Sequence, residues 1–260
     1  MLVVTADDLG LSESVDSAIL TAHRAGVVRS TSLLVTFPRA AEAAELARGE
    51  RALEIGLHLD LVEGTPVSDP ARVPTLLGPD GRFRGLGPLF AALVTRRVRA
   101  EEIAAEVRAQ VARARALGTP ALAWDSHRHV HLFPLVARVV GALGRELDAR
   151  WIRRAAPPRA RVGWKQASLA LATVGSAPFF RGVAGNDWYV DLTSERSLPD
   201  AARVALLAAL PGVGEVTAHP GTRADAGDAL GARRPRDLAL LTDPLLRAAL
   251  GTDVVRPRVL

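Results

Sequence analysis

The segment LVVTADDLG at residues 2–10 has the pattern of a buried strand that ends in two adjacent carboxylates, Asp7 and Asp8. An amphipathic helix is predicted directly after it, at residues 12–25, because apolar side chains recur on one face and a glycine follows. The aspartates occupy the turn that carries a glycine-rich fingerprint in dinucleotide-binding folds, so that fold is not indicated. The segment predicts the first strand–helix unit of an α/β protein, with acidic side chains at the C-terminal end of the strand.

Strand-like and helical segments alternate along the whole chain, which favours a parallel α/β fold. Further strands are predicted at residues 30–36, 53–59, 121–125, 151–153, 188–192, 214–218 and 253–255, and further helices at residues 40–48, 100–117, from 134, and near 164–175, 199–210 and 235–250. About eight strands in 260 residues fit a single (β/α) barrel, TIM-barrel-like and distorted, with the active site at the C-terminal strand ends. A doubly wound open sheet is the structural alternative.

Residues 61–99 interrupt this alternation and contain several glycines and prolines. A segment of this length within a compact domain is usually a functional loop or a lid. We therefore expect one catalytic domain over residues 1–260, in which residues 61–99 form a long loop at the rim of the barrel.

The composition excludes several classes of protein. The chain has no cysteine, so disulfides and cysteine-ligated zinc are excluded, and no apolar run approaches the roughly 20 residues that span a bilayer. The N-terminus lacks the features of a signal peptide, and a cytoplasmic location is expected. The net charge of +5 comes from arginines spread along the chain, and aromatic residues make up only 4%, so nucleic-acid binding is not expected.

Three more predicted strands end in histidine. His58 lies at the end of the third strand, His219 follows the strand at residues 214–218, and the run DSHRHVH at residues 125–131 holds three alternating histidines. The C-terminal ends of barrel strands form one rim, so these imidazoles and the aspartate pair are expected to share a site. Aspartate and histidine ligate divalent metals, and a second carboxylate is available for acid–base catalysis. The pattern favours a metal-dependent hydrolase.

Each of these histidines also has a structural interpretation as a hydrogen-bonded core or turn residue. The three alternating histidines could bind one metal by themselves, or one or two of them could only hydrogen-bond nearby groups. Asp125 could orient a ligand histidine by accepting its second N–H. His219 is placed to protonate a leaving group or to stabilise an oxyanion.

Together the motifs resemble the YdjC-like carbohydrate deacetylase family, which includes the chitooligosaccharide deacetylases. The matching segments occur in the family's order, and they are TADDLGLS at 5–12, AHxxG at 22–26, STSLLV at 30–35, IGLHL at 55–59, DSHRHVHLFP at 125–134 and HPG at 219–221. Leu9 stands where the family usually has phenylalanine. The resemblance implies a distorted barrel that hydrolyses a linear amide, the N-acetyl group of an N-acetylated sugar, and releases acetate.

The resemblance also implies roles for individual residues. The implied metal ligands are Asp8, His58 and His127. The implied catalytic residues are Asp7 as general base and His219 as acid or orienting group. The expected substrate contacts are Arg153, His129 and His131, and Asp125 is expected to support a ligand histidine. One divalent cation is implied, and the family is usually described with magnesium. Zinc, cobalt or manganese would also accept such ligands.

Other functions remain open at this stage. The substrate could be a lipid-linked amino sugar of the hopanoid type. A metal-dependent sugar isomerase or phosphoesterase would more often need a lysine or a second metal, and the only lysine, Lys165, lies in a predicted helix. A non-catalytic carbohydrate-binding protein would not need Asp7 beside Asp8. A homodimer is compatible with the sequence.

Overall fold

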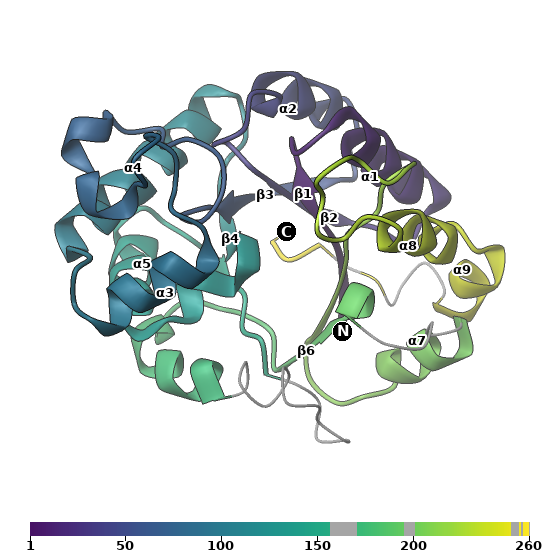
Figure 1. Cartoon of the computed structure of the whole chain (residues 1–260). Helices are drawn as coiled ribbons and strands as arrows, with labels where there is room; N and C mark the ends of the chain where they lie inside the picture. The colour runs from purple at the N-terminus through teal and green to yellow at the C-terminus, as the bar shows by residue number, and fades with distance from the viewer. Residues whose placement is uncertain (157–170, 195–200, 251–254, 256, 260) are drawn as a thin grey trace.

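The computed structural model describes residues 1–156, 171–194, 201–250, 255 and 257–259. Seven strands form a single all-parallel sheet in the order β5-β4-β3-β2-β1-β7-β6. The strands are β1 Leu2–Leu9, β2 Ser30–Leu33, β3 Glu54–Leu59, β4 Ala123–Ser126, β5 Trp151–Ile152, β6 Trp188–Asp191 and β7 Gly214–Ala218. The sheet curls, and helices surround it on the outside (Figure 1). The predicted distorted barrel is confirmed.

Helices connect successive strands of this sheet. The α-helices are α1 Glu13–Ala25, α2 Ala40–Arg48, α3 Leu86–Val94, α4 Ala100–Ala116, α5 Pro134–Glu146, α7 Ala201–Ala208, α8 Arg233–Leu241 and α9 Pro244–Leu250, and the 3₁₀ helices are η1 Pro70–Arg72, η2 Pro74–Leu76, η3 His127–Leu132, η4 Ala177–Phe180 and η5 Leu192–Ser194. None of the helices in the described ranges has the length and apolar character needed to cross a membrane. Lys165 and the start of the helix predicted near 164–175 lie outside the described residues.

The ring of strands is incomplete between β5 and β6. There, single hydrogen bonds take the place of a ladder: the Ile152 amide donates to the Ala184 carbonyl at 2.9 Å, and the Tyr189 amide donates to the Ala156 carbonyl at 2.7 Å. The eighth predicted strand, at 253–255, lies mostly outside the described residues, and Val255 forms an isolated bridge. The described residues therefore form seven strands, where about eight were predicted.

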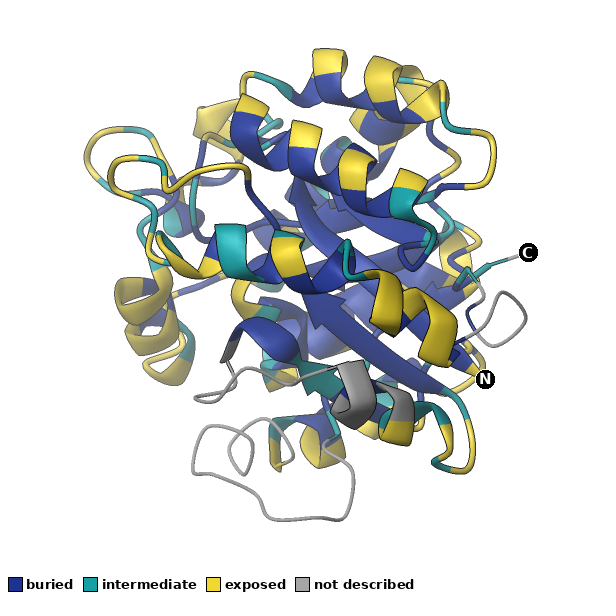
Figure 2. Ribbon diagram, turned by 90° about the vertical axis from the view of Figure 1, so that its right-hand side faces the viewer, coloured by how far each residue is buried: buried dark blue, intermediate teal, exposed yellow. Residues whose placement is uncertain are grey.

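The first strand–helix unit follows the sequence pattern. All eight residues of β1 are buried, as expected for a parallel strand covered on both faces. The Ser12 hydroxyl caps α1 by accepting from the Val15 amide at 3.3 Å, and Gly26 ends the helix with a left-handed φ of 103°. Figure 2 shows the strands as a buried centre beneath helices whose outer faces are exposed. This unit brings the aspartate pair to the top of the barrel.

Residues 61–99 are more ordered than the sequence indicated. They contain η1, η2 and α3, and α4 holds them in place. The Glu106 carboxylate accepts from the amides of Val67 and Ser68, each at 2.9 Å, and Glu102 accepts from the Thr75 amide at 2.7 Å. These bonds attach the rim segment to the barrel.

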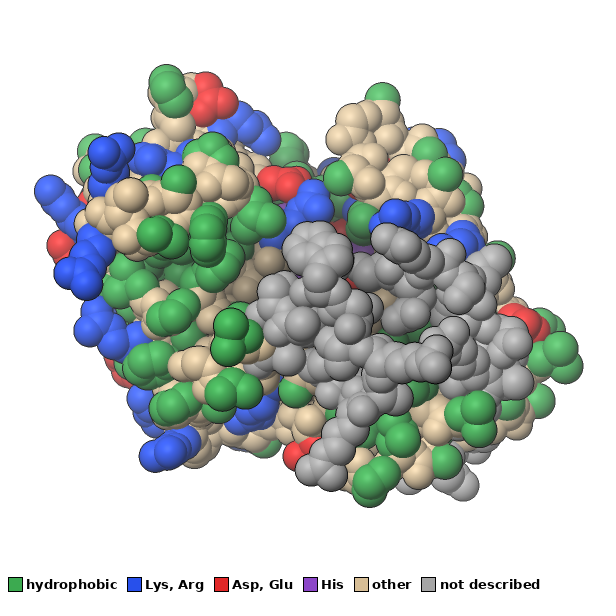
Figure 3. Space-filling model, turned by 60° about the horizontal axis from the view of Figure 1, so that its bottom comes forward, with side chains coloured by type: hydrophobic (Ala, Val, Ile, Leu, Met, Phe, Trp, Pro, Cys, Tyr) green, Lys and Arg blue, Asp and Glu red, His purple; other side chains and the backbone are tan. Residues whose placement is uncertain are grey.

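The α3 helix presents an apolar stripe to solvent. Leu86, Phe90 and Val94 recur every four residues and are 39%, 50% and 65% exposed. Figure 3 shows hydrophobic side chains gathered on the face of the molecule beside the undescribed residues. The rim segment is therefore polar where it meets α4 and apolar along α3.

Candidate metal centre and active site

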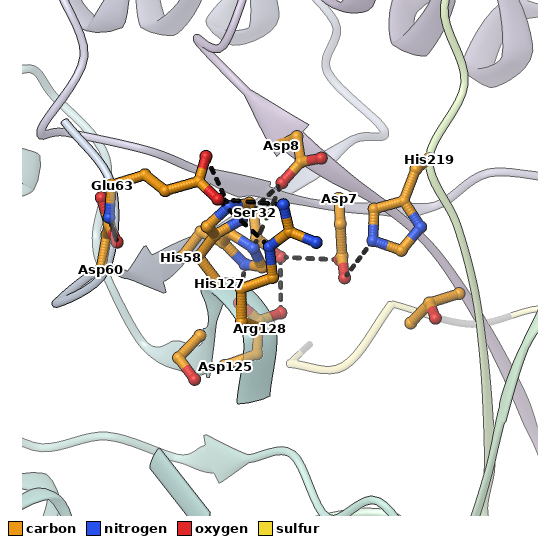
Figure 4. A network of polar contacts seen from close by, with 12 residues as sticks. Asp7, Asp8, Ser32, His58, Asp60, Glu63, Asp125, His127, Arg128 and His219 are labelled. Carbon is orange, nitrogen blue, oxygen red and sulfur yellow. Dashed lines mark hydrogen bonds and ion pairs between the residues drawn. The ribbon is translucent and has the colours of Figure 1, made fainter. Parts of the chain in front are cut away.

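The two aspartates both reach the site because β1 is irregular at its end. Side chains alternate along a regular strand, so adjacent residues would point to opposite faces. Here Asp8 adopts a left-handed φ of 72°, and the register between β1 and β2 shifts between Ala6 and Leu9. Both carboxylates are buried at the top of the barrel, and Figure 4 shows Asp7 and Asp8 side by side.

Asp8, His58 and His127 form a triangle of buried donor atoms. Asp8 Oδ1 lies 3.4 Å from His58 Nε2 and 3.1 Å from His127 Nδ1. Two ligand atoms about 2.0–2.1 Å from one ion, at angles between octahedral and tetrahedral, lie about 2.8–3.4 Å apart. The donor types and their spacing therefore fit one divalent cation (Figure 4).

His58 is oriented by Asp125. The Nδ1 nitrogen of His58 lies 2.6 Å from Asp125 Oδ1, which leaves Nε2 facing Asp8. The other oxygen of Asp125 accepts from the Ser32 hydroxyl at 2.5 Å and pairs with Arg153 at 2.7 Å. A carboxylate that holds the outer nitrogen of a histidine fixes the tautomer and the direction of the ring. Asp125 thus has the geometry predicted for a supporting residue.

His127 faces a second carboxylate, from the rim segment. Its Nε2 nitrogen is buried and lies 3.4 Å from Glu63 Oε2, outside a regular hydrogen bond. Glu63 also pairs with Arg128 at 2.9 Å, and its amide donates to the buried Asp60 carboxylate at 3.0 Å. Each candidate ligand histidine therefore has a carboxylate against the nitrogen that faces away from Asp8.

The two imidazoles are strongly basic in the absence of a metal. Burial alone would lower the pKa of His58, but the carboxylates of Asp125, Asp8 and Asp7 together raise it to about 9. Burial also opposes the charge on His127, whereas contacts with Asp8 and Glu63 raise its pKa to about 10. Burial would raise the pKa of Asp8, yet the two histidines hold it well below its usual value. A divalent cation bound here would displace the imidazole protons and take over their positive charge.

Asp7, His58 and Asp125 form a second set of neighbouring donor atoms. Here an arginine already supplies the positive charge. Arg153 is fully buried and binds both oxygens of Asp7 at 2.7 and 2.8 Å. It also pairs with Glu215 at 2.9 Å. The set that contains Asp8 is the better candidate for a metal, because Arg234 occupies only Oδ2 of Asp8 and Oδ1 faces two imidazoles, whereas Arg153 binds both oxygens of Asp7.

His219 lies on the other side of Asp7 from the candidate ligands (Figure 4). Its Nε2 is 3.9 Å from Asp7 Oδ2, and its Nδ1 is 2.8 Å from the Thr193 hydroxyl. Asp237 accepts hydrogen bonds from that hydroxyl and from the His219 amide. These contacts point Nε2 of His219 toward the aspartate pair.

The sequence matches the YdjC-like protein family over residues 1–252. The chain belongs to this family. It is 35% identical over 291 residues to a mouse (Mus musculus) protein named carbohydrate deacetylase, and the alignment covers 98% of this chain and 92% of the relative. A Brevibacillus brevis protein of the same name is 41% identical over 146 residues, which is 56% of each chain.

A crystal structure of an Enterococcus faecalis V583 protein, whose name links it to cellobiose-phosphate cleavage, has a TM-score of 0.81 to this chain. The two are 24% identical, and the match covers 98% of this chain and 95% of that one. This likeness supports the fold alone.

Two expected substrate contacts of this YdjC-like chain lie inside the protein. Arg153 is 0% exposed. His131 is buried with both ring nitrogens engaged, Nδ1 with the Ser126 hydroxyl at 2.5 Å and Nε2 with the Arg153 carbonyl at 2.9 Å. Burial lowers the pKa of His131 to about 4, so the ring is neutral. Both side chains are held by protein groups in this structure, and their contact with a substrate stays a prediction.

His129 is the expected contact that remains partly exposed. It lies in η3, where Arg128 and His129 both have left-handed backbones with φ of 57° and 56°. Its Nε2 is 3.2 Å from the Tyr189 hydroxyl. The left-handed pair bends the chain directly after His127 and places Arg128 against Glu63.

Three charged residues of the site had no signal in the sequence analysis. Glu63 comes from the rim segment, Arg234 from α8 and Arg258 from the C-terminal segment. Arg234 donates to Asp8 Oδ2 at 2.9 Å, which leaves Oδ1 to the two histidines. None of the three lies directly at the end of a predicted strand, so the strand-end rule that identified the other candidates could not find them.

Proposed function

We propose that this YdjC-like chain is a metal-dependent carbohydrate deacetylase that removes the acetyl group of an N-acetylated sugar, such as a chitooligosaccharide. The observation that carries the proposal is the triangle of Asp8, His58 and His127 with a further carboxylate, Asp7, beside it. The names of the two relatives support the same reaction class. The products would be acetate and a free amino sugar.

Asp8, His58 and His127 would hold the cation. A divalent metal bound there supplies Lewis-acid polarisation of the acetamide carbonyl and acidifies a bound water. Magnesium is the metal implied by the family resemblance, whereas two imidazole donors also suit zinc, cobalt or manganese. Three protein ligands leave positions for water and for the carbonyl oxygen, as catalytic sites require.

Asp7 is the proposed general base. Both of its oxygens accept from Arg153, so the carboxylate is held in one orientation at the edge of the triangle. From this position Asp7 takes a proton from the water that attacks the acetamide carbon. Arg153, which lies behind Asp7 and has no access to solvent, acts as a positioning residue.

His219 is the proposed general acid. The Thr193 hydroxyl engages Nδ1 and leaves Nε2 directed at the aspartate pair. Nε2 therefore gives a proton to the departing amine when the tetrahedral intermediate breaks down. Asp237 fixes both Thr193 and the His219 amide, so the imidazole is supported from two directions.

The rim segment at residues 61–99 is the proposed selector of the sugar, because it borders His127 through Glu63. One catalytic domain over residues 1–260, a cytoplasmic location and a homodimer remain predictions.

An acetate assay tests the function. Purified protein is incubated with N-acetylated chitooligosaccharides, stripped with a chelator, and then supplied with magnesium, zinc, cobalt or manganese. We expect acetate release, its loss after stripping, and its return with at least one metal. No acetate from any N-acetyl sugar or glycolipid, with metal bound at Asp8, His58 and His127, would refute the assignment.

A further inference from the structure

The C-terminal segment enters the floor of the barrel. Val255 pairs with Leu2 at the start of β1, and the Arg258 amide donates to the Ser30 hydroxyl at 3.2 Å. Figure 1 shows this yellow segment within the ring of strands, and Figure 2 shows both termini on the same side of the molecule. Arg258 therefore approaches the site from the end of the barrel opposite the rim.

The guanidinium of Arg258 is fully buried and makes contacts on every side. Nη1 donates to Asp125 Oδ2 at 2.6 Å and to the Ser32 hydroxyl at 3.3 Å. Nη2 donates to the Thr31 carbonyl at 2.6 Å, and Nε donates to Glu54 Oε2 at 2.8 Å. The side chain thus spans from a half-buried carboxylate at the floor to the carboxylate that orients His58.

A glycine in β3 makes room for this arginine. A Cβ atom at Gly56 would lie 2.2 Å from Arg258 Nη2, and also 2.6 Å from the Ala123 carbonyl oxygen. Real Cβ contacts are essentially never that short. Gly56 lies in the IGLHL motif, two residues before His58. Gly56 therefore leaves room both for Arg258 and for the Ala123 carbonyl of the neighbouring strand.

We propose that Arg258 is a positioning residue for the metal centre, acting through Asp125. By occupying Asp125 Oδ2 it leaves Oδ1 to hold His58 Nδ1 at 2.6 Å, with Nε2 toward Asp8. The inference rests on the proposed metal site and adds a residue to it.

The expected effect is partial, because Arg153 also pairs with Asp125 Oδ2 at 2.7 Å. Loss of an outer partner of a ligand histidine typically weakens metal binding 10–100-fold. We expect Arg258→Gln to fall in this range, of about 10-fold or more, and Arg258→Lys to recover part of the loss since it keeps a charge near Asp125.

The test is calorimetric titration of the metal-stripped full chain with zinc chloride. Glu54→Gln is the matched control, because it removes the other carboxylate partner of Arg258 and leaves the bond to Asp125. We expect Arg258→Gln to weaken zinc binding and Glu54→Gln to change it by less than about 3-fold. Thermal midpoints, measured in parallel, report any loosening of the C-terminal segment that both variants share.

A double-mutant cycle then tests the route through Asp125. In an Asp125→Ala background, Arg258→Gln is expected to cause no further loss of zinc affinity. Equal losses in both backgrounds, or equal weakening by Glu54→Gln and Arg258→Gln, would overturn the positioning role. Wild-type affinity in Arg258→Gln would overturn it while leaving the proposed function intact. A wild-type chain that binds no metal would overturn both.

Discussion

Two neighbouring groups of charged residues at the centre of this barrel differ in the cations that face their carboxylates. The rim cluster comprises Asp8, His58, His127 and Glu63. Its two imidazoles face Asp8 Oδ1, while Arg234 and Arg128 pair with the other oxygens of Asp8 and Glu63. The interior cluster comprises Asp7, Asp125, Glu215, Arg153 and Arg258, and its positive charges are guanidiniums. An imidazolium can lose its proton to water and then ligate a metal ion, whereas guanidinium remains charged and cannot ligate. The rim cluster can therefore exchange protons for a cation, and the interior cluster acts as a fixed support.

The largest effect is expected at Asp7, the member of the interior cluster that faces the proposed reaction. Asp7→Asn should lower turnover by about 10²–10⁴, because the amide cannot take a proton from water. Zinc affinity should stay close to wild type, since Asp7 belongs to the interior cluster. Steady-state acetate release and calorimetry measure the two quantities. Asp148→Asn, at an exposed aspartate, is the control. Loss of metal in Asp7→Asn would break the division into two clusters.

Removing the central arginine of the interior cluster should destabilise the fold. Arg153→Met leaves Asp7, Asp125 and Glu215 without their shared cation, and breaking a buried ion pair from one side typically costs about 3–5 kcal/mol. Urea unfolding gives the free energy directly. The surface variant Arg108→Met, which breaks an exposed pair with Glu146, should leave the midpoint unchanged. Similar midpoints for the two variants would mean that the interior cluster is not a structural support.

A smaller effect is expected at Glu63 in the rim cluster. Glu63→Gln should weaken zinc binding about 10–100-fold, because it removes the carboxylate beside the outer nitrogen of His127. The matched control is Glu146→Gln, which disrupts a surface arginine–glutamate pair with no histidine nearby. If Glu63→Gln binds zinc with wild-type affinity, Glu63 does not support His127 and only forms the ion pair with Arg128.

A last effect concerns pH and tests the rim cluster without mutation. His58 and His127 have folded pKa values of about 9 and about 10, above their ordinary value of 6.5. Their protonation therefore stabilises the metal-free fold fully below pH 6.5, and this contribution is lost as pH rises through 9–10. The thermal midpoint of stripped protein should fall over that window. A midpoint that rises or stays level there would contradict the charged state of the rim cluster.

The strand-end rule accounts for what the sequence could predict. Asp7, Asp8, His58 and His219 each follow an apolar run, and parallel strands bring such positions to one rim. His127 follows the same pattern at the end of β4. The order of strands and helices was predictable for the same reason, since apolar periodicity marks each segment. The rim helix α3 was not predicted, because the surrounding glycines and prolines obscure its nine-residue pattern.

The supporting charges could not be predicted because their partners are remote in sequence. Arg234 and Asp8 are 226 residues apart, and Arg258 and Asp125 are 133 apart. Hydrophobic periodicity and short motifs describe neighbouring residues, so they cannot indicate a pair this far apart in the sequence. Arg153 illustrates the same limit: the family resemblance implied a substrate contact, whereas its three carboxylate partners, Asp7, Asp125 and Glu215, come from distant parts of the sequence.

The left-handed backbone at residues 128–129 restricts how this enzyme could acquire new substrates by mutation. Glycine, asparagine and aspartate enter the left-handed region most readily, and β-branched residues rarely do. β-Branched substitutions at Arg128 and His129 would therefore strain the backbone beside a candidate ligand. The exposed stripe of α3 carries no such restriction. In a directed-evolution library, variation along α3 would sample far more side chains that still fold than variation at these two positions.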